Sequence, residues 1–293
     1  MSNYKILTDS CIDLPLELIK ELKLEVIPLT VTINQQEYKN YADEREITFK
    51  RFYDLLREEY VPKTSQLSPI DQIQAMESIL KEGKDVLSIS FSSALSGTYQ
   101  SSVIAKKELE GLYPDRQIIC IDSKCASMGM GLLVTYAARM ANAGKPMEEV
   151  AEWVIKHHLK VSHLFTVGDL NHLKRGGRLS ASKAFIGTLI QLKPLLHVDG
   201  LGKLVPIAKA RGRRLAMNKM VERMIETIEN PLEQSIYISH ADCIEDAQYV
   251  KSLIQEKIQI KDVLINYIGP VIGAHSGLNT LAIFYLGNDR TTK

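Results

Sequence analysis

The sequence contains, at residues 85–102, the stretch Asp85-Val-Leu-Ser-Ile-Ser-Phe-Ser-Ser-Ala-Leu-Ser-Gly-Thr-Tyr-Gln-Ser-Ser102. Its first part is a short apolar run, which predicts a buried strand over residues 86–91. A helix is expected to follow and to reach Leu109, and the turn between them is rich in hydroxyl groups. Strand, turn and helix in this order are typical of one unit of a parallel α/β layer.

The hydroxyl groups of this turn suggest a binding role. Five of them lie close together, and Gly97 allows the backbone to approach a bound group: Ser90, Ser92, Ser93, Ser96 and Thr98. A helix N-terminus offers unpaired N–H groups and a partial positive charge, which suit a small anion. Ser92 or Ser93 is expected to cap the helix. Since a cap needs fewer hydroxyls, we interpret the turn as an oxyanion or carboxylate site.

The alternation of strands and helices extends over the first part of the chain. Strands are expected at 4–8, 25–33 and 117–122, and helices at 14–22, 47–60, 69–82, 128–143 and 146–159. The second part is more mixed. It is expected to contain a strand at 161–167, helices at 170–174, 184–190, 214–229 and 244–258, a hairpin of 195–198 with 204–208, and strands at 235–239, 263–268 and 280–286.

These elements predict an α/β protein of two domains. Residues 1–160 form an N-terminal parallel-sheet α/β domain, and residues 161–293 form a C-terminal α+β domain. The chain of 293 residues is 45% hydrophobic and 24% charged, which is ordinary for a globular protein. It has no apolar run near the ~20 residues of a membrane span and no signal-peptide pattern at its start, so we expect a cytoplasmic location.

Charge is unevenly distributed although the net charge is only +1. The segment 171–220 holds 11 Lys and Arg and one acid, Asp199, which leaves 25 basic and 34 acidic residues elsewhere. This basic segment indicates an anionic partner: nucleic acid, a nucleotide or an acidic protein surface. Nucleic acid is disfavoured because the segment lacks interleaved aromatics and a recognition-helix pattern. A merely solvated basic face stays an alternative.

Two further segments carry polar groups near predicted helix ends. In Pro62-Lys-Thr-Ser-Gln-Leu-Ser-Pro69, Ser68 is expected to cap a helix, which leaves Thr64 and Ser65 free to face a ligand. In Lys174-Arg-Gly-Gly-Arg-Leu-Ser-Ala181, Arg178 could hold a phosphate or carboxylate. A glycine helix end followed by a serine cap explains that second segment equally well.

A third segment, Gly269-Pro-Val-Ile-Gly-Ala-His-Ser-Gly277, places His275 in a glycine-rich turn after a strand. Histidine can donate to a carboxylate while it stays near neutrality. No acidic neighbour is fixed beside it, so a Ser-His-acid triad is unsupported. The four cysteines have no zinc or CxxC spacing and the histidines show no metal-binding face, so neither a metal nor another cofactor is expected.

Together these segments resemble the DegV family of bacterial fatty-acid-binding proteins, some of which carry lipid for a fatty acid kinase. The resemblance covers essentially the whole chain and rests on six motifs in order: Thr8-Asp-Ser-Cys-Ile-Asp-Leu-Pro15, Lys63-Thr-Ser-Gln66, Ser92-Ser-Ala-Leu-Ser-Gly-Thr-Tyr99, Leu173-Lys-Arg-Gly-Gly-Arg178, Lys193-Pro194 with Asp199-Gly200, and Gly269 to Gly277. Any one of them is weak, and six in this order are specific.

The resemblance implies a fatty acid buried between the two domains and no catalytic residues in this chain. Its carboxylate would be bound by Thr64, Ser96 and His275. Secondary ligand contacts are expected at neighbouring positions: Ser65, Ser93, Gly97, Thr98 and Ser276. The partner implied is an ATP-dependent fatty acid kinase that phosphorylates the bound acid to an acyl phosphate, docked at Arg178 and Arg211, with no nucleic acid involved.

Two positions depart from the family pattern. Leu278-Asn279 replaces a usual Pro-Gly, and Leu67 stands where proline is common. They affect the expected pocket shape and acyl preference more than the fold. Two other functions are compatible with the residues: a hydrolase or acyltransferase that uses Ser96 and His275, and a regulatory protein whose basic segment binds nucleic acid.

Overall fold

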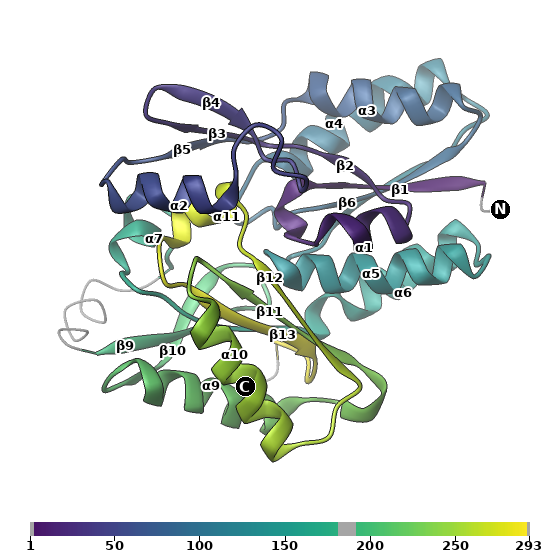
Figure 1. Ribbon diagram of the computed structural model, residues 1–293. Helices are drawn as coiled ribbons and strands as arrows, with labels where there is room; N and C mark the ends of the chain where they lie inside the picture. Colours follow the sequence, from purple (N-terminus) through teal and green to yellow (C-terminus); the bar gives the residue numbers. More distant parts are fainter. Residues whose placement is uncertain (1–2, 181–191, 292–293) are drawn as a thin grey trace.

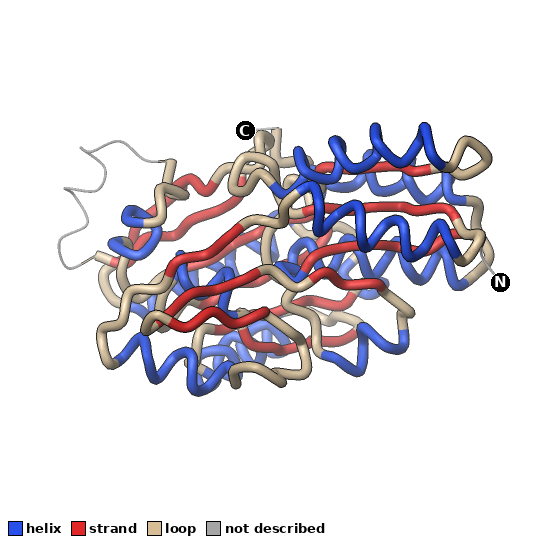
Figure 2. Tube along the Cα trace, turned by 90° about the horizontal axis from the view of Figure 1, so that it is seen from above, coloured by secondary structure: helices blue, strands red, loops and turns tan. Residues whose placement is uncertain are grey.

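The computed structural model describes residues 3–180 and 192–291. Within these ranges the strands form three sheets. Figure 1 shows the N-terminal sheet and its helices stacked on a second α/β layer, and Figure 2 shows the same two layers from above. The predicted fold class, α/β with two domains, is confirmed, while the boundary near residue 160 stays a prediction.

The first sheet is parallel throughout, with strand order β2-β1-β6-β7. Its strands are β1 (Tyr4–Asp9), β2 (Glu25–Ile27), β6 (Asp85–Ser90) and β7 (Ile118–Asp122). Its helices are α1 (Leu16–Glu21), α3 (Pro69–Lys81), α4 (Thr98–Leu112), α5 (Met128–Asn142) and α6 (Met147–His157). Helices α3 and α4 cover one face and α1, α5 and α6 the other (Figure 1).

Helix α3 begins as its sequence predicts. The Ser68 hydroxyl accepts a hydrogen bond from the Asp71 N–H at 3.2 Å, and the Asp71 carboxylate accepts one from the Ser68 N–H at 2.8 Å. This reciprocal capping box satisfies two backbone donors, and Pro69 occupies the first helical position. The Ser68 cap, four residues after Thr64, therefore fixes the start of α3.

The single strand expected at 25–33 is wrong. The segment forms β2 and β3 (Thr30–Ile33), which belong to different sheets. Pro28 lies between them and has no N–H to donate to a ladder, while the Leu29 N–H donates to the Ser10 hydroxyl at 3.0 Å. Strand β3 pairs with two strands that the sequence did not indicate, β4 (Gln36–Lys39) and β5 (Lys63–Ser65), and helix α2 (Phe49–Arg57) follows β4.

The second large sheet has the order β10-β9-β8-β13-β11-β12, antiparallel except for the pair β11 and β12. Its strands are β8 (Val161–Thr166), β9 (Lys193–Val198), β10 (Leu204–Ala210), β11 (Ser235–His240), β12 (Asp262–Tyr267) and β13 (Leu281–Leu286). The predicted hairpin of β9 and β10 is confirmed. The helix predicted at 184–190 lies in part of the chain that is not described.

Helix α9 (Arg213–Thr227) shows how this second sheet is covered. Met217, Met220, Val221 and Met224 recur at helical spacing, and all are buried in a cluster with strand residues. Helix α10 (Ile244–Lys257) adds Ala247, Val250 and Ile254 to the same cluster. Short helices α7 (Asn171–Arg175) and α11 (Pro270–Ser276) lie beside each other away from this cluster (Figure 1).

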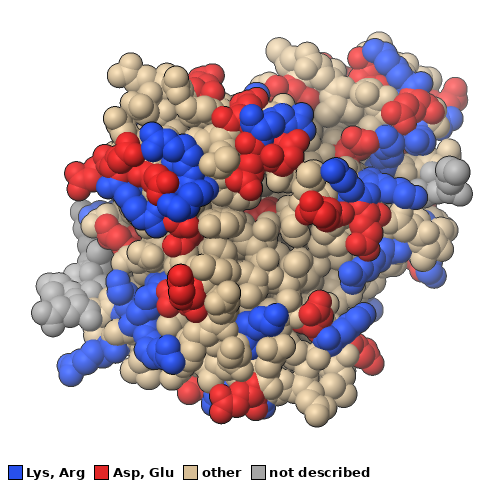
Figure 3. Space-filling model, in the orientation of Figure 1, with Lys and Arg blue, Asp and Glu red and all other residues tan. Residues whose placement is uncertain are grey.

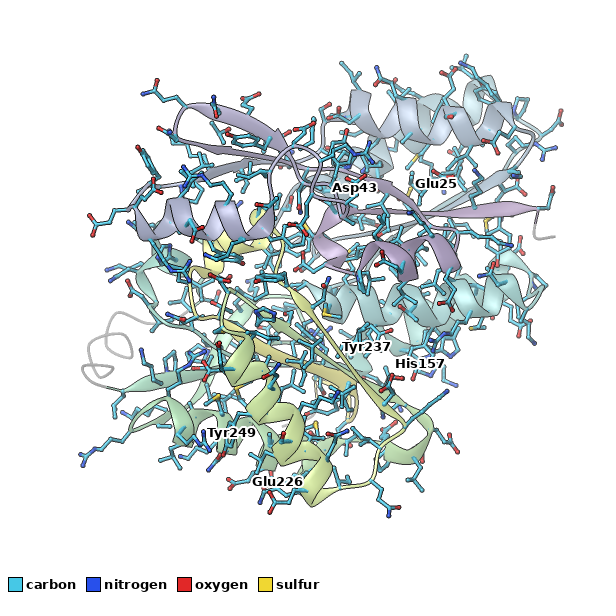
Figure 4. All side chains as sticks on the ribbon, viewed as in Figure 1. Glu25, Asp43, His157, Glu226, Tyr237 and Tyr249 are labelled. Atoms are coloured by element: carbon cyan, nitrogen blue, oxygen red, sulfur yellow. The ribbon has the colours of Figure 1, made fainter. Side chains whose placement is uncertain are left out.

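Helix α5 joins the two layers. Its buried residues occur on nearly every face, as expected for a helix with both layers as neighbours. The Tyr237 hydroxyl of β11 donates to the Thr135 hydroxyl of α5 at 3.3 Å, and Figure 4 labels Tyr237 at this junction. None of the helices in the described ranges is both long and apolar enough to span a membrane.

Candidate functional site

A cavity of about 440 Å³ lies between the two layers. Both layers contribute to its wall, which is largely apolar: Leu29, Phe91, Leu95, Phe165, Leu173, Val198, Leu204, Ile268, Val271, Ile272, Ala282 and Phe284. This volume falls in the range of small-molecule sites, which combine apolar walls with a few placed polar groups. Polar side chains gather at two places in the wall.

The first polar group centres on Thr64 and His275. The Thr64 Oγ1 atom lies 2.8 Å from the His275 Nε2 atom, and both residues line the cavity. Thr64 is held by β5, whose pairing with β3 places it opposite Val31. His275 lies in the last turn of α11, so the pair bridges the two layers.

The glycine-rich segment that carries His275 is a short helix, and the expectation of a turn is wrong. Gly269 precedes the helix and Pro270 occupies its first turn, where a missing N–H has no cost. The Gly277 N–H donates to the Gly273 carbonyl at 2.8 Å, and Gly277 then takes φ = +75°, which ends the helix. The helix fixes His275 and Ser276 at the cavity.

The His275 imidazole is neutral near pH 7. Burial, and then the nearby Arg178 guanidinium, lower its pKa to about 4. Its Nδ1 edge packs so closely on Gly176 that a Cβ atom at that position would overlap it. The Gly-Gly-Arg segment therefore supports the histidine, which the sequence did not indicate.

Ser96 lines the same cavity and lies two residues before the start of helix α4. Helix α4 begins after Gly97, and the expectation that Ser92 or Ser93 caps it is wrong. The Gly97 N–H donates to the Gln66 side-chain oxygen at 3.0 Å, and the Thr98 N–H donates to the Ser96 hydroxyl at 3.3 Å. The first backbone N–H groups of α4 thus already donate to side chains. A ligand would therefore contact Ser96 and Gln66 and not the N–H groups of the helix.

The other hydroxyls of the serine-rich turn have structural partners. The Ser92 hydroxyl donates to the Gly202 carbonyl at 2.9 Å, which ties this turn to the β9–β10 hairpin. The Ser93 hydroxyl donates to the Asp122 carboxylate at 2.5 Å, and Thr98 is buried beside Ser96. Ser93, Gly97 and Thr98 lie outside the cavity wall as the structure defines it, whereas Ser65 and Ser276 belong to it.

Ser276 is notable because its buried hydroxyl oxygen has no hydrogen-bond partner in the described part of the chain. Leaving a buried hydroxyl unpaired costs about 1–3 kcal/mol. The residue lines the cavity next to His275. An oxygen-bearing ligand at this end of the cavity would supply the missing partner.

Arg178 also lines the cavity. Its Nε atom donates to the Leu95 carbonyl at 3.1 Å and its Nη1 atom to the Gly176 carbonyl, so it connects the two layers beside His275. Arg211, the other expected docking residue, is exposed between β10 and α9. Figure 3 shows basic side chains gathered at the lower left, over the end of the second layer where β9, β10 and α9 lie.

The second polar group was not expected from the sequence. Ser127, which precedes α5, and Ser239 of β11 line the cavity, and Ser127 reaches the buried carboxylate of Asp13. Each residue is unremarkable by itself, since serine before a helix predicts an ordinary cap. In the part of the chain that is described, no group of three His, Cys, Asp or Glu side chains could hold a metal ion.

Known proteins are similar to this chain in sequence and in architecture. A family model described as an uncharacterised protein of the DegV family matches residues 3–288. A DegV domain-containing protein of Clostridium perfringens is 45% identical over 290 residues, with 99% of both chains covered.

Solved structures extend this likeness. A fatty-acid-binding DegV family protein from Thermus thermophilus has a TM-score of 0.88 at 29% identity, covering 98% of this chain and 100% of that chain. DegV, a fatty acid binding protein from Bacillus subtilis, has a TM-score of 0.85 at 29% identity, with 98% and 100% covered.

Proposed function

The chain belongs to the DegV family, and from this membership and the cavity we propose that it binds a long-chain fatty acid. The solved relatives from Thermus thermophilus and Bacillus subtilis are fatty-acid-binding proteins. In this proposal the tail occupies the cavity and the carboxylate lies at Thr64, Ser96 and His275. The observation that carries it is the pair Thr64 and His275, 2.8 Å apart in the wall of a largely apolar cavity.

The chemistry of the cavity suits a fatty acid. Burying ~15 methylenes at ~0.8 kcal/mol each gives roughly 12 kcal/mol before the costs of ordering and association. The tail therefore supplies the affinity, and the head group needs orientation more than a strong ion pair. Two hydroxyls and a neutral imidazole donate hydrogen bonds to a carboxylate without forming an ion pair with it. The unpaired Ser276 hydroxyl supports an oxygen-bearing ligand at this end.

We further propose that the protein presents the bound acid to an ATP-dependent kinase in the cytoplasm, which phosphorylates it to an acyl phosphate. The chain has no Walker A sequence, so the ATP site would belong to the partner. Arg211 is exposed and suits docking to an acidic surface. Arg178 lies at the cavity beside His275, where its charge would also favour an anionic head group.

A stand-alone hydrolase is disfavoured by the same geometry. Among the described residues, the His275 Nε2 atom pairs with Thr64, whereas the Ser96 hydroxyl pairs with Thr98. A nucleophilic serine needs a base within hydrogen-bond reach.

The nucleic-acid alternative has only the basic segment in its favour. Retention of the protein on a DNA column at physiological salt would support this alternative. If the protein is not retained, a protein partner is the better explanation of the basic segment.

The first experiment is extraction of the purified protein with organic solvent and mass spectrometry of any lipid released. A stoichiometric fatty acid supports the proposal and gives a first estimate of chain preference. The delipidated protein is then titrated with palmitic and oleic acids. A protein that carries no lipid and takes up neither acid would contradict the proposed function.

Presentation to a kinase is tested separately. The loaded protein is mixed with ATP and a bacterial fatty acid kinase catalytic subunit, and acyl phosphate is trapped with hydroxylamine. Arg211→Ala is expected to slow phosphorylation without changing fatty acid affinity. If the protein binds fatty acid tightly but no acyl phosphate forms, the proposed binding function stands and the proposed presentation to a kinase is contradicted.

A further inference from the structure

The second polar group of the cavity has the form of a relay. The Ser127 hydroxyl donates to the Asp13 Oδ2 atom at 2.6 Å and lies 3.2 Å from the Ser239 hydroxyl. Ser127 and Ser239 line the cavity, and Asp13 lies behind them. Three oxygen-bearing side chains thus meet here, from the residue after η1 (Ser10–Ile12), the residue before α5 and strand β11. His163 and Thr280 are further polar residues of the same cavity wall, and the His163 Nε2 atom accepts from the Ala126 N–H at 3.1 Å.

The Ser127 hydroxyl does not cap the following helix, although capping is the usual role of a serine at this position. Ser127 is the residue before α5, yet its side chain makes no capping hydrogen bond. Its backbone takes φ = +51° and ψ = −146°, which is a strained conformation for a residue other than glycine. The fold therefore keeps this hydroxyl turned toward Asp13 and the cavity at the cost of both a cap and backbone strain.

Asp13 fixes the far end of the relay. Its Oδ1 atom accepts from the Gly269 N–H at 3.0 Å, and its carbonyl accepts from the Asn266 side chain at 2.8 Å. Among the described residues, no Lys, Arg or His forms an ion pair with Asp13. Its ionisable neighbours are Asp9, which raises its pKa, and the Cys11 and Tyr53 groups, whose own pKa values it raises.

This end of the cavity therefore suits a neutral polar group and disfavours an anion. Burial raises the pKa of Asp13 to about 7, so ionised and protonated forms coexist near neutrality. When Asp13 is ionised, Ser127 donates to it and Ser239 can donate to Ser127, which leaves lone pairs of Ser239 for the cavity. When Asp13 is protonated, the relay can reverse and Ser239 becomes a donor. A hydroxyl group matches both states because it can donate and accept.

We propose that Ser127 and Ser239 form a second binding subsite, which recognises a hydroxyl group carried on the acyl chain, so that hydroxylated fatty acids are a ligand class of this cavity. The inference rests on the proposed fatty acid binding function and extends it to the substrate class. The two polar groups of the wall differ in charge, since Arg178 lies beside His275 and the Asp13 carboxyl lies behind Ser127, so the carboxylate is directed toward Arg178.

The position of the hydroxyl follows from α11. This helix begins at Pro270, next to the Gly269 N–H that contacts Asp13, and it carries His275 in its last turn. Five residue steps at about 1.5 Å each separate Pro270 and His275 by about 7.5 Å. The subsite therefore corresponds to a hydroxyl in the body of the chain and not beside the carboxylate.

The experiment compares stearic acid with hydroxystearic acids that carry the hydroxyl at successive chain positions. Delipidated protein is titrated with each acid by displacement of a fluorescent fatty acid. One mid-chain isomer is expected to bind about three- to tenfold more tightly than stearic acid, as one net hydrogen bond allows. Ser239→Ala is expected to bring this ratio to about one. Ser127→Ala serves as the second variant if Ser239→Ala fails to fold.

Ser102→Ala is the matched control, because its buried hydroxyl donates to the Tyr99 carbonyl inside α4 and lies away from the cavity. It should keep the wild-type ratio. Wild-type protein that binds stearic acid but prefers no hydroxylated isomer overturns the subsite and leaves the proposed function intact. A preference that survives in both Ser239→Ala and Ser127→Ala also overturns it. Protein that binds none of the acids overturns the proposed function itself.

Discussion

Thr64 and His275 lie 211 residues apart in the sequence, yet the Thr64 Oγ1 and His275 Nε2 atoms are 2.8 Å apart. One belongs to a strand of the small N-terminal sheet and the other to a short helix of the second layer. The hydrogen bond therefore joins the two layers at the cavity wall. A change to either of these two residues should therefore act on ligand binding.

Thr64→Val removes the hydroxyl while it keeps the shape of the side chain. In the proposed complex this deletes one hydrogen bond to a charged carboxylate, so fatty acid affinity should fall about ten- to hundredfold. Titration of delipidated protein with palmitic acid measures the effect. The Thr135 hydroxyl donates to the Gly131 carbonyl and accepts from the Tyr237 hydroxyl outside the cavity wall, so Thr135→Val should bind palmitic acid as the wild type does. Equal affinities for the two variants would show that Thr64 does not contact the ligand.

His275 should make stability depend on pH. Its folded-state pKa of about 4 lies below the usual histidine pKa of 6.5, so between these values the unfolded chain takes up a proton that the folded chain does not. The free energy of unfolding therefore carries the full contribution of His275 above pH 6.5. It loses about 3 kcal/mol as the pH falls from 6.5 toward 4.

The measurement is urea denaturation of the wild type and His275→Gln at a series of pH values. The difference between their unfolding free energies isolates His275, because the other titrating groups are common to both proteins. The wild type should lose more stability than the variant as the pH is lowered through this window. Parallel curves would mean that His275 titrates normally in the folded protein.

Gly176→Ala should displace the His275 imidazole. The backbone of Gly176 has φ = −71°, which alanine tolerates, but the added Cβ would overlap the Nδ1 atom. Misplacing one hydrogen-bonding partner should lower fatty acid affinity about tenfold. In Gly111→Ala the added Cβ meets nothing within 4 Å in helix α4, so that variant should keep its affinity and gain slight stability. Wild-type affinity in Gly176→Ala would argue that the ligand does not depend on the histidine position.

Arg290 holds several segments together near the end of the chain. Its guanidinium donates to backbone carbonyls of Leu159, Val198, Asp199, Lys124 and His158. Arg290→Ala leaves these partly buried acceptors unpaired and should lower the free energy of unfolding by about 3 kcal/mol or more. Chemical denaturation measures the loss. Arg223→Ala removes an exposed pair with Glu226 and should cost about 0.5 kcal/mol or less.

The sequence alone predicted most of the local elements and the family, but not β4, β5 or α11. Apolar periodicity and caps determine helix and strand positions through contacts within a few residues, which is why α3 begins at its Ser68 cap and the β9–β10 hairpin forms as expected. The six ordered motifs led to the DegV family, and the comparisons confirm it. Pro28 was visible in the sequence, but the assignment of β2 and β3 to different sheets depended on which strands lie nearby.

The arrangement of the site was decided by tertiary structure. Sequence could name Thr64 and His275 as candidates, but their pairing depends on how two layers meet. The same holds for Gln66, which takes the Gly97 N–H, and for Ser127, whose hydroxyl turns from its helix to Asp13. Such hydrogen bonds join residues far apart in the chain, and their partners compete with local ones of similar strength. Only the packed fold determines which partner is within reach.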